Sequence, residues 1–264
     1  TSCVILDRSF VSIPMTHPFL DHPGCLAFAH RGDHHAGPEN TLIAFESAVK
    51  QGFRYLETDV HLTSDGILLA FHDDKLDRVT DGNGPIAKLS YESIRSVRVA
   101  GSESIPRLDE LLTSFPDTRF NIDPKSDASV GPLIRLILDL GVQDRICVGS
   151  FSDRRIRRVR EAIPGICTST GPIETFRARL SSFGIPTGDI RGLAAQVPIR
   201  WNGIRVVDQR FIDAMHRRGL QIHVWTVNEP HQMNELLDMG IDGIMTDQPA
   251  TLKQLLIDRG QWSG

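Results

Sequence analysis

The sequence predicts one α/β domain, a (β/α)8 TIM barrel with a small insertion after its second strand, from three observations. The chain has 264 residues, and a barrel of this kind typically needs about 250. Short apolar segments alternate with amphipathic ones along most of the chain, as strands and helices do in parallel α/β folds. Eight such strand-like segments are present, which favours a closed barrel over an open doubly wound sheet.

The first two strands and a hairpin are the clearest elements. Residues 26–32 form a short apolar run that is typical of a buried strand, and residues 55–62 form a second one. The dipeptide Asp65-Gly66 precedes a third apolar run at 67–71. Because this dipeptide favours a tight hairpin, we expect an antiparallel excursion here.

The alternation continues to the end of the chain. One polar, turn-rich segment at about 73–106 interrupts it, and we interpret this segment as the insertion. The pattern is weakest over 170–206, where helical and strand periodicity are both poor. The later predicted strands are 120–123, 145–150, 165–169, 193–197, 221–227 and 243–245. The predicted helices are 41–52, 107–115, 130–140, 153–162, 208–218, 230–239 and 250–259.

Residues 1–24 precede the alternation and are apolar but broken by charges and prolines. We therefore expect an N-terminal arm, followed by the barrel over 25–264. The simplest interpretation is an arm packed across the domain. The alternative is a juxtamembrane segment that gives peripheral association with a membrane. No run approaches the roughly 20 apolar residues that a membrane helix requires.

Composition excludes several classes of protein. The net charge is −4, which argues against a nucleic-acid partner, so an anionic ligand would be held by local cations. The four cysteines lack the CxxC spacing of zinc sites. Cys147 and Cys167 lie inside apolar runs and are expected to be buried thiols.

Three acidic residues predict a metal site. Glu57 and Asp59 are two positions apart on a predicted strand, so their side chains share one face, which is the lumen in a barrel. Asp123 ends another strand. Neighbouring carboxylates repel each other unless a cation relieves them, and a hard divalent cation such as Mg2+ or Ca2+ prefers oxygen ligands.

Two histidines and two cations accompany these acids. His30 and His72 each end a predicted strand and suggest a general acid and a general base. Arg31 offers a planar fork for a phosphate and Lys125 a compact cation. The set indicates chemistry on an anionic ester. The neighbouring loop also contains His34 and His35, and whether either touches substrate stays open.

Eight strings, in this order, resemble the glycerophosphodiester phosphodiesterase family. They run from residue 29 to residue 249 and read AHRG, PENT, ETDVHLTSDG, FHDDKLDRVTDG, NIDPK, GSF, VWTVN and GIDGIMTDQP. The first four together are highly specific. The resemblance implies a (β/α)8 barrel with a small insertion after the second strand and an enzyme that hydrolyses glycerophosphodiesters.

The resemblance also implies roles for individual residues. His30 and His72 would be the acid–base pair, and Glu57, Asp59 and Asp123 would hold one divalent cation, Mg2+ or Ca2+. Further positions match substrate-binding motifs: Arg31 and Lys125 for the phosphate, and Ser150, Phe151 and Trp225 in the pocket. The family commonly has Glu where this chain has Asp123, which leaves the ion preference open.

The expected reaction is metal-dependent hydrolysis of a glycerophosphodiester to glycerol phosphate and an alcohol, with His30 as the favoured base and His72 as the favoured acid. The substrate is then a small-molecule phosphodiester. One alternative is lysophospholipase D-like hydrolysis of lysophospholipids. Another is a barrel that binds phosphodiesters without turnover.

A lipid substrate would need an apolar rim at the mouth of the barrel. Residues 173–206 lie where barrel loops overhang that mouth, and their large apolar residues would form the rim. These residues are Phe176, Phe183, Ile185, Ile199 and Trp201. Packing over the helices explains them equally well.

Overall fold

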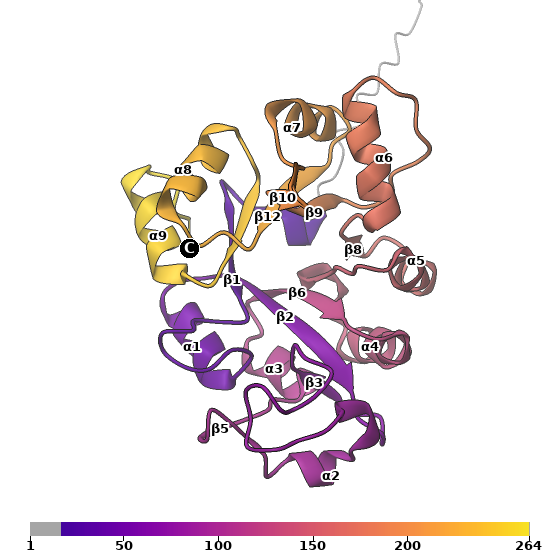
Figure 1. Cartoon of the computed structure of the whole chain (residues 1–264), viewed down its shortest axis with the longest axis vertical. Helices are drawn as coiled ribbons and strands as arrows, with labels where there is room; N and C mark the ends of the chain where they lie inside the picture. The colour runs from indigo at the N-terminus through magenta and orange to yellow at the C-terminus, as the bar shows by residue number, and fades with distance from the viewer. Residues whose placement is uncertain (1–16, 264) are drawn as a thin grey trace, which may run out of the picture.

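The computed structural model describes residues 17–263 and shows a nearly closed barrel of eight parallel strands with helices between them (Figure 1). Going round the barrel, the order is β8-β7-β6-β2-β1-β13-β12-β9. The strands are β1 (Leu26–His30), β2 (Tyr55–Leu62), β6 (Arg119–Pro124), β7 (Ile146–Val148), β8 (Cys167–Thr168), β9 (Ala194–Pro198), β12 (Gln221–Trp225) and β13 (Gly243–Thr246). The predicted fold is confirmed.

One seam of the barrel is held by few bonds. Between β8 and β9 the only paired residues in the described chain are Ser169 and Ala194, which form an isolated parallel bridge. Backbone bonds from Thr170 N to Ala194 O and from Leu193 N to Thr168 O support this bridge, at 2.8 and 2.9 Å. The short β8 leaves little edge for a longer ladder.

The helices cover the outside of the barrel. They are α1 (Leu42–Lys50), α3 (Leu108–Ser114), α4 (Asp127–Leu140), α5 (Asp153–Ala162), α6 (Pro172–Ser182), α7 (Gln209–His216), α8 (Pro230–Asp238) and α9 (Pro249–Asp258). Strand residues that face the helices form the main core, among them Leu56 and Val60 of β2. Among the described residues, no helix combines the length and the apolar character needed to cross a bilayer.

A second core fills the lumen of the barrel toward the N-terminal ends of its strands. Phe28 and Tyr55 lie in it with the buried thiols of Cys147 and Cys167, so the prediction for these cysteines is confirmed. The 3-10 helix η1 (Pro18–Leu20) adds Phe19 and Leu20 to this core. The Tyr55 hydroxyl donates to the Phe19 carbonyl at 2.9 Å, so residues 17–24 close the N-terminal end of the barrel. The rest of the expected 1–24 arm, residues 1–16, lies outside the described residues.

The insertion has a small core of its own. After the antiparallel β3 (Leu68–Ala70) it contains η2 (Ile86–Lys88), α2 (Tyr91–Ile94), β4 (Arg98–Val99) and β5 (Glu103–Ser104). Figure 1 shows it at one end of the molecule, beyond β2. Its core comprises Leu69, Phe71, Leu76, Ile86, Ile94, Val99 and Ile105. These apolar residues are irregularly spaced in the sequence. The sequence pattern therefore indicates only a polar, turn-rich segment and does not predict a core.

The weakly patterned segment 170–206 is more regular than its sequence suggests. It contains α6, β9 and a hairpin made by β10 (Arg200–Trp201) and β11 (Ile204–Arg205). In α6 only Ala178 and Ser182 are buried. A helix that buries so few large side chains has little apolar periodicity, so its sequence does not predict it.

Candidate active site

Strand register brings the predicted site residues together at the C-terminal end of the barrel. His30 at the end of β1 pairs in register with Glu57 of β2. Asp59 of β2 pairs in register with Asp123 of β6. Because paired positions on neighbouring strands carry their side chains on the same face, the imidazole and the three carboxylates face one space.

The loop after β1 is shaped by backbone constraints. Arg31 has a left-handed φ of 57°, and Gly32 follows with a φ of 89°. A Cβ on Gly32 would lie 2.7 Å from the Ala44 carbonyl carbon of α1, so this position requires glycine. Asn40 N donates to Arg31 O at 2.9 Å, and the Asn40 side chain accepts from Thr58 of β2. The Arg31 side chain is thereby held over the end of β2.

His30 is oriented by a carboxylate from the last strand. Its Nδ1 donates to Asp247 Oδ1 at 2.6 Å, and its Nε2 lies 3.7 Å from Glu57 Oε2. Asn228 donates to the other Asp247 oxygen at 2.8 Å. Burial alone would lower the pKa of His30, but Glu57 and Asp247 outweigh it and raise that pKa. Burial would raise the pKa of Asp247, but its bond from His30 holds it at about 2, so Asp247 acts as an acceptor.

His72 has a matching arrangement. Its Nδ1 donates to Asp73 Oδ1 at 2.6 Å. Arg78 of the insertion donates to both oxygens of Asp73, at 2.6 and 3.1 Å, and this contact lowers the pKa of Asp73 to about 2. Arg78 also donates to both oxygens of Glu39, at 2.7 and 3.1 Å, and Glu39 accepts from Arg31 at 3.2 Å. In both histidines, a carboxylate at Nδ1 leaves Nε2 available for proton transfer.

The buried acids and cations are paired closely. Lys125 Nζ lies 2.7 Å from Asp59 Oδ1 and 3.0 Å from Asp123 Oδ2, and Arg31 Nε lies 3.1 Å from Asp59 Oδ2. Despite burial, these cations hold the pKa of Asp59 below its ordinary value. Burial and the nearby Asp59 raise the pKa of Glu57 to about 7, and burial raises that of Asp123.

The donor set fits a hard cation. Among residues 17–263 no group of three His, Cys, Asp or Glu side chains is already arranged around one ion. However, Glu57 Oε2, Asp59 Oδ2 and Asp123 Oδ1 are buried and accept no hydrogen bond, although Arg31 Nε lies 3.1 Å from Asp59 Oδ2. None of these three atoms is an oxygen that Lys125 contacts. A buried carboxylate oxygen that accepts no hydrogen bond is costly, and a divalent cation is a natural ligand for three such oxygens.

All the residues predicted for the site line one cavity of about 530 Å³. Phe151 and Trp225 form an aromatic wall with ring centroids 5.5 Å apart, and Ser150 lies beside them. Trp201 extends this wall, with its ring 6.0 Å from that of Phe151, and Phe176 also lines the cavity. The cavity therefore has an ionic floor and an apolar wall.

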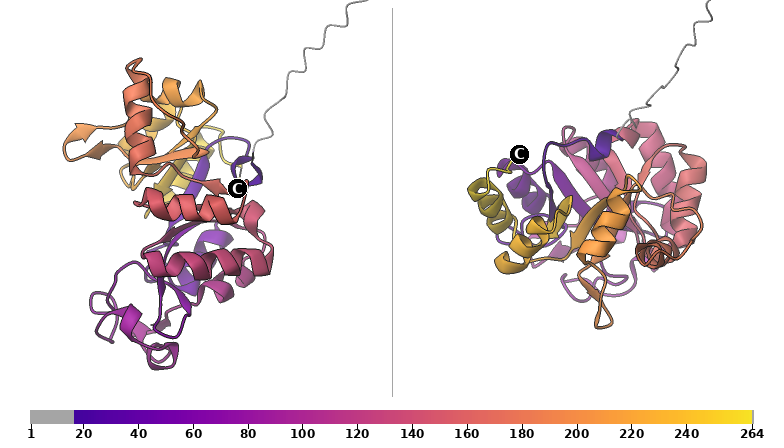
Figure 2. Two further views of the ribbon diagram at one scale, coloured as in Figure 1. Left: turned by 90° about the vertical axis from the view of Figure 1, so that its right-hand side faces the viewer. Right: turned by 90° about the horizontal axis from the view of Figure 1, so that it is seen from above.

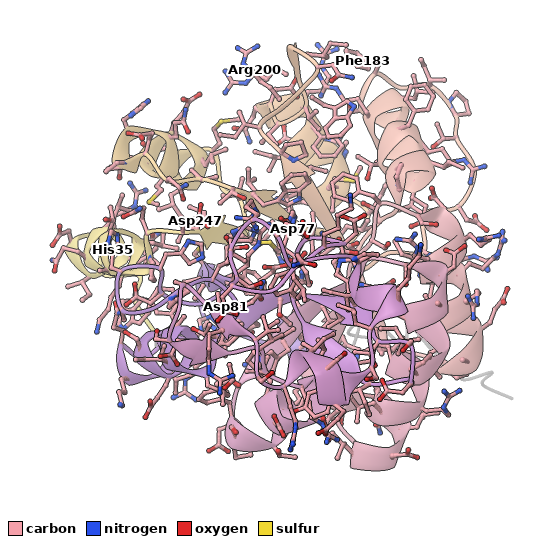
Figure 3. The ribbon with its side chains drawn as sticks, turned by 60° about the horizontal axis from the view of Figure 1, so that its bottom comes forward. His35, Asp77, Asp81, Phe183, Arg200 and Asp247 are labelled. Carbon is pink, nitrogen blue, oxygen red and sulfur yellow. The ribbon has the colours of Figure 1, made fainter. Side chains whose placement is uncertain are left out.

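Some predicted positions lie elsewhere. Of the five apolar residues expected at a rim, Phe176 and Trp201 line the cavity, whereas Phe183, Ile185 and Ile199 do not. Phe183 lies under the guanidinium groups of Arg179 and Arg210. His34 lines a second depression beside Arg78, and its Nδ1 lies 3.8 Å from Asp247 Oδ1. His35 bonds to Gln248 at 2.7 Å and lies away from the centre in Figure 3.

The sequence argument did not single out the partners that orient the histidines. Asp247, labelled in Figure 3, follows β13 directly, and Asn228 lies three residues beyond the end of β12. Asp247 follows the same pattern as His30, a polar residue at the end of an apolar strand, and that signal marks it as a candidate site residue. Arg78 and Glu39 lie in loops, where spacing indicates no shared face.

The fold and the site define a class of protein, a (β/α)8 barrel with two carboxylate-held imidazoles, two cations and three acids at its C-terminal mouth. A model of the glycerophosphoryl diester phosphodiesterase family matches residues 30–251. The chain belongs to this family, as the motifs predicted, and the prediction of an enzyme is confirmed.

Three relatives illustrate the range of similarity. A Mycobacterium tuberculosis protein named probable glycerophosphodiester phosphodiesterase 2 is 38% identical, covering 94% of this chain and 97% of its own length. A lysophospholipase D of Rattus norvegicus is 27% identical, covering 86% and 85%. A phosphodiesterase from Oleispira antarctica, solved with the product sn-glycerol-3-phosphate, has a TM-score of 0.76 at 22% identity, covering 89% and 97%, and supports the fold alone.

Proposed function

We propose that this protein hydrolyses glycerophosphodiesters to glycerol phosphate and an alcohol, using one divalent cation and the pair His30 and His72. The observation that carries the proposal is the arrangement of the two imidazoles in one cavity with Arg31 and Lys125. Each imidazole is held through Nδ1 by a carboxylate at 2.6 Å. Two oriented imidazoles beside anion-binding groups suit acid–base cleavage of a phosphate ester.

The two histidines would divide the proton transfers. One takes a proton at Nε2 from the nucleophile, which is water or the neighbouring glycerol hydroxyl. Attack by the hydroxyl releases the alcohol and forms a cyclic phosphate, which water must then open to give glycerol phosphate. The other donates a proton from Nε2 to the leaving alkoxide. His30 as the base and His72 as the acid stays a prediction. Because Asp247 and Asp73 fix the ring orientations, neither imidazole has to reorganise during the reaction.

Charge balance supports the cation. Arg31 and Lys125 form ion pairs with Asp59 and Asp123. Their positive charge is therefore partly neutralised and is not fully available to bind a phosphate. Glu57, Asp59 and Asp123 would hold Mg2+ or Ca2+, which when bound supplies Lewis-acid polarisation of a phosphoryl oxygen. With the carboxylates compensated in this way, Arg31 and Lys125 are available to contact the substrate's phosphoryl oxygens.

The test is turnover of glycerophosphocholine with and without metal. We expect glycerol phosphate and choline as products, loss of activity after exhaustive chelation, and recovery with Mg2+ or Ca2+. Undiminished turnover after chelation would remove the cation from the mechanism. Tight binding of the diester without product would instead favour the non-catalytic alternative.

Hydrolysis of lysophospholipids is the second candidate, because the cavity has an apolar wall that includes Phe176 and Trp201. An acyl chain against this wall would gain about 0.8 kcal/mol per buried methylene. If the candidate is correct, kcat/KM for lysophosphatidylcholine exceeds that for glycerophosphocholine. Phe176→Ala and Trp201→Ala then lower only the lipid value, while the control Phe183→Ala changes neither. An equal loss on both substrates would contradict it. Association of the 1–24 arm with a membrane stays a separate prediction.

A further inference from the structure

The hairpin formed by β10 and β11 carries an unusual exposed apolar surface beside the cavity. Trp201 is 52% exposed, Ile204 is 71% exposed, and Phe176 of the neighbouring α6 is 63% exposed. All three also line the mouth of the cavity. Large apolar side chains gathered in this way at the rim of a site mark an interaction surface more often than a free surface.

The hairpin is a defined structure with two different faces. Its turn is Asn202-Gly203, with φ angles of 48° and 82°, which suits a tight two-residue hairpin. Trp201 pairs with Ile204 across the strands, and Arg200 pairs with Arg205. Directly opposed side chains share a face, and successive pairs alternate. The hairpin therefore has an apolar face and a basic face, on which Arg205 is paired with Glu235 and Arg200 has no carboxylate partner among the described residues.

The charge of the surrounding segment is opposite to that of the whole protein. Residues 171–210 contain six arginines against three carboxylates, whereas the chain has a net charge of −4. Glu174 is paired with Arg160 from outside the segment, Asp208 is paired with Arg179, and Arg205 is paired with Glu235 of α8. Among the described residues this leaves four arginines of the segment without a carboxylate partner: Arg177, Arg191, Arg200 and Arg210. Arg200, on the basic face of the hairpin, projects from the edge of the molecule in Figure 3. This local positive charge suits an anionic partner.

Position completes the description of the surface. In the left view of Figure 2 the orange hairpin projects on the same side as the insertion, whereas η1 lies on the opposite side. The hairpin thus extends from the catalytic end of the barrel, and η1 closes the other end. A flat surface that met Trp201 and Ile204 would lie directly over the cavity mouth.

We propose that the β10–β11 hairpin docks this protein onto a phospholipid bilayer that carries anionic headgroups. Trp201 and Ile204 enter the interfacial layer, where an indole is favoured, and Arg200 lies beside the headgroups. The combination of exposed apolar side chains with basic neighbours is the reason for choosing a bilayer over a purely anionic or purely apolar partner. The proposal concerns where the enzyme works and goes beyond the reaction.

The first experiment measures binding of the full chain to vesicles. We expect stronger cosedimentation with phosphatidylcholine vesicles that contain phosphatidylglycerol than with phosphatidylcholine alone, and weaker binding as salt rises. Arg200→Glu should lower the partition coefficient at least about fivefold. The control is Arg135→Glu, an exposed arginine on α4, which should have no effect. Equal binding to both kinds of vesicle, or binding unaffected by Arg200→Glu, would overturn the proposal.

The second experiment identifies the residue that enters the lipid. The chain has three tryptophans, and phospholipids with brominated acyl chains quench only those that reach the bilayer. We expect strong quenching of the wild type that disappears in Trp201→Phe. Trp262→Phe should keep it, because Trp262 packs on Phe53 beside the C-terminus. Quenching that persists in Trp201→Phe would place the contact elsewhere and refute the proposal.

Activity separates this proposal from the proposed function. Arg200 does not line the cavity, so Arg200→Glu should hydrolyse a soluble glycerophosphodiester at the wild-type rate while binding vesicles poorly. Vesicle binding without turnover of any diester would contradict the reaction and leave the docking surface supported. Turnover of the diester without selective vesicle binding would support the reaction and contradict the docking surface.

Discussion

At the scale of single residues, the notable feature is that His30 and His72 are oriented alike by carboxylates from different parts of the chain. The partner of His72 is the next residue, Asp73, whereas the partner of His30 is Asp247, 217 positions away. A carboxylate at Nδ1 selects one tautomer and fixes the orientation of the ring. The structure therefore offers two similarly oriented groups for proton transfer in one cavity.

Removal of either imidazole should abolish most of the activity. His30→Ala and His72→Ala should each lower kcat about 100-fold or more, the scale of general acid–base groups. Both variants should keep the wild-type circular dichroism spectrum, because the two residues contribute little to the apolar core. Steady-state kinetics on glycerophosphocholine provides the measurement, and a wild-type kcat in either variant would make that histidine structural.

Arg31 offers a second prediction at this scale. In Arg31→Lys we expect kcat/KM to fall about tenfold or more, because an ammonium cannot reproduce the planar fork that suits a phosphate. The same variant also loses the contact with Glu39. Wild-type kcat/KM in Arg31→Lys would count against Arg31 as a phosphate clamp.

At the scale of elements, the insertion is tied to the site through one side chain. Arg78 bonds Asp73 and Glu39, and these two carboxylates contact His72 and Arg31. The insertion thus braces the end of β3 against the loop after β1. Its own core keeps this brace in place.

Loss of this brace should affect activity more than stability. We expect Arg78→Ala to lower kcat about tenfold, in the range found for residues that orient a ligand or a catalytic group. The side chain is 48% exposed, so the melting temperature should change little. Arg95→Ala is the matched control in the same insertion, since Arg95 pairs only with the exposed Glu92. Equal activity in the two variants would show that the brace has no role.

At the scale of the whole molecule, the seam between β8 and β9 depends on Arg160 of α5. This side chain donates to Thr168 Oγ1 at 2.7 Å, to Ser169 O at 3.0 Å, and to both oxygens of Glu174 at 2.7 and 2.9 Å. It therefore links β8 to α6 where strand pairing is sparse. A bidentate ion pair that is largely shielded from solvent, as this one is, is costly to break from one side.

The seam should make stability depend on pH. Burial opposes ionisation of Glu174, but Arg160 outweighs it and the pKa of Glu174 is lowered. Its contribution is complete above the unfolded pKa of about 4.3 and is lost as the pH falls through the lower folded pKa. Glu174→Gln should therefore be less stable than wild type at pH 7, by about 1–3 kcal/mol, and the difference should shrink below about pH 4.

Thermal unfolding of both proteins from pH 7 to pH 3 measures this difference. Glu161→Gln is the control, because Glu161 is exposed and lies 3.9 Å from Arg157. A gap between wild type and Glu174→Gln that stays constant with pH would contradict the prediction.

Local periodicity determined much of this protein from sequence alone. The alternation of apolar runs and amphipathic helices specified the barrel. Positions on the predicted strands indicated His30, Glu57, Asp59 and Asp123 as site residues, because a side chain's face on a strand depends only on its position. The metal and the division of roles stay predictions. Only the tertiary structure decided that Asp247 meets His30, since register between β1 and β13 is a long-range property. Only the structure likewise showed the contacts of Arg78 with Asp73 and Glu39 and the presence of α6, because loop contacts and a helix with few buried residues have no periodic signal in the sequence.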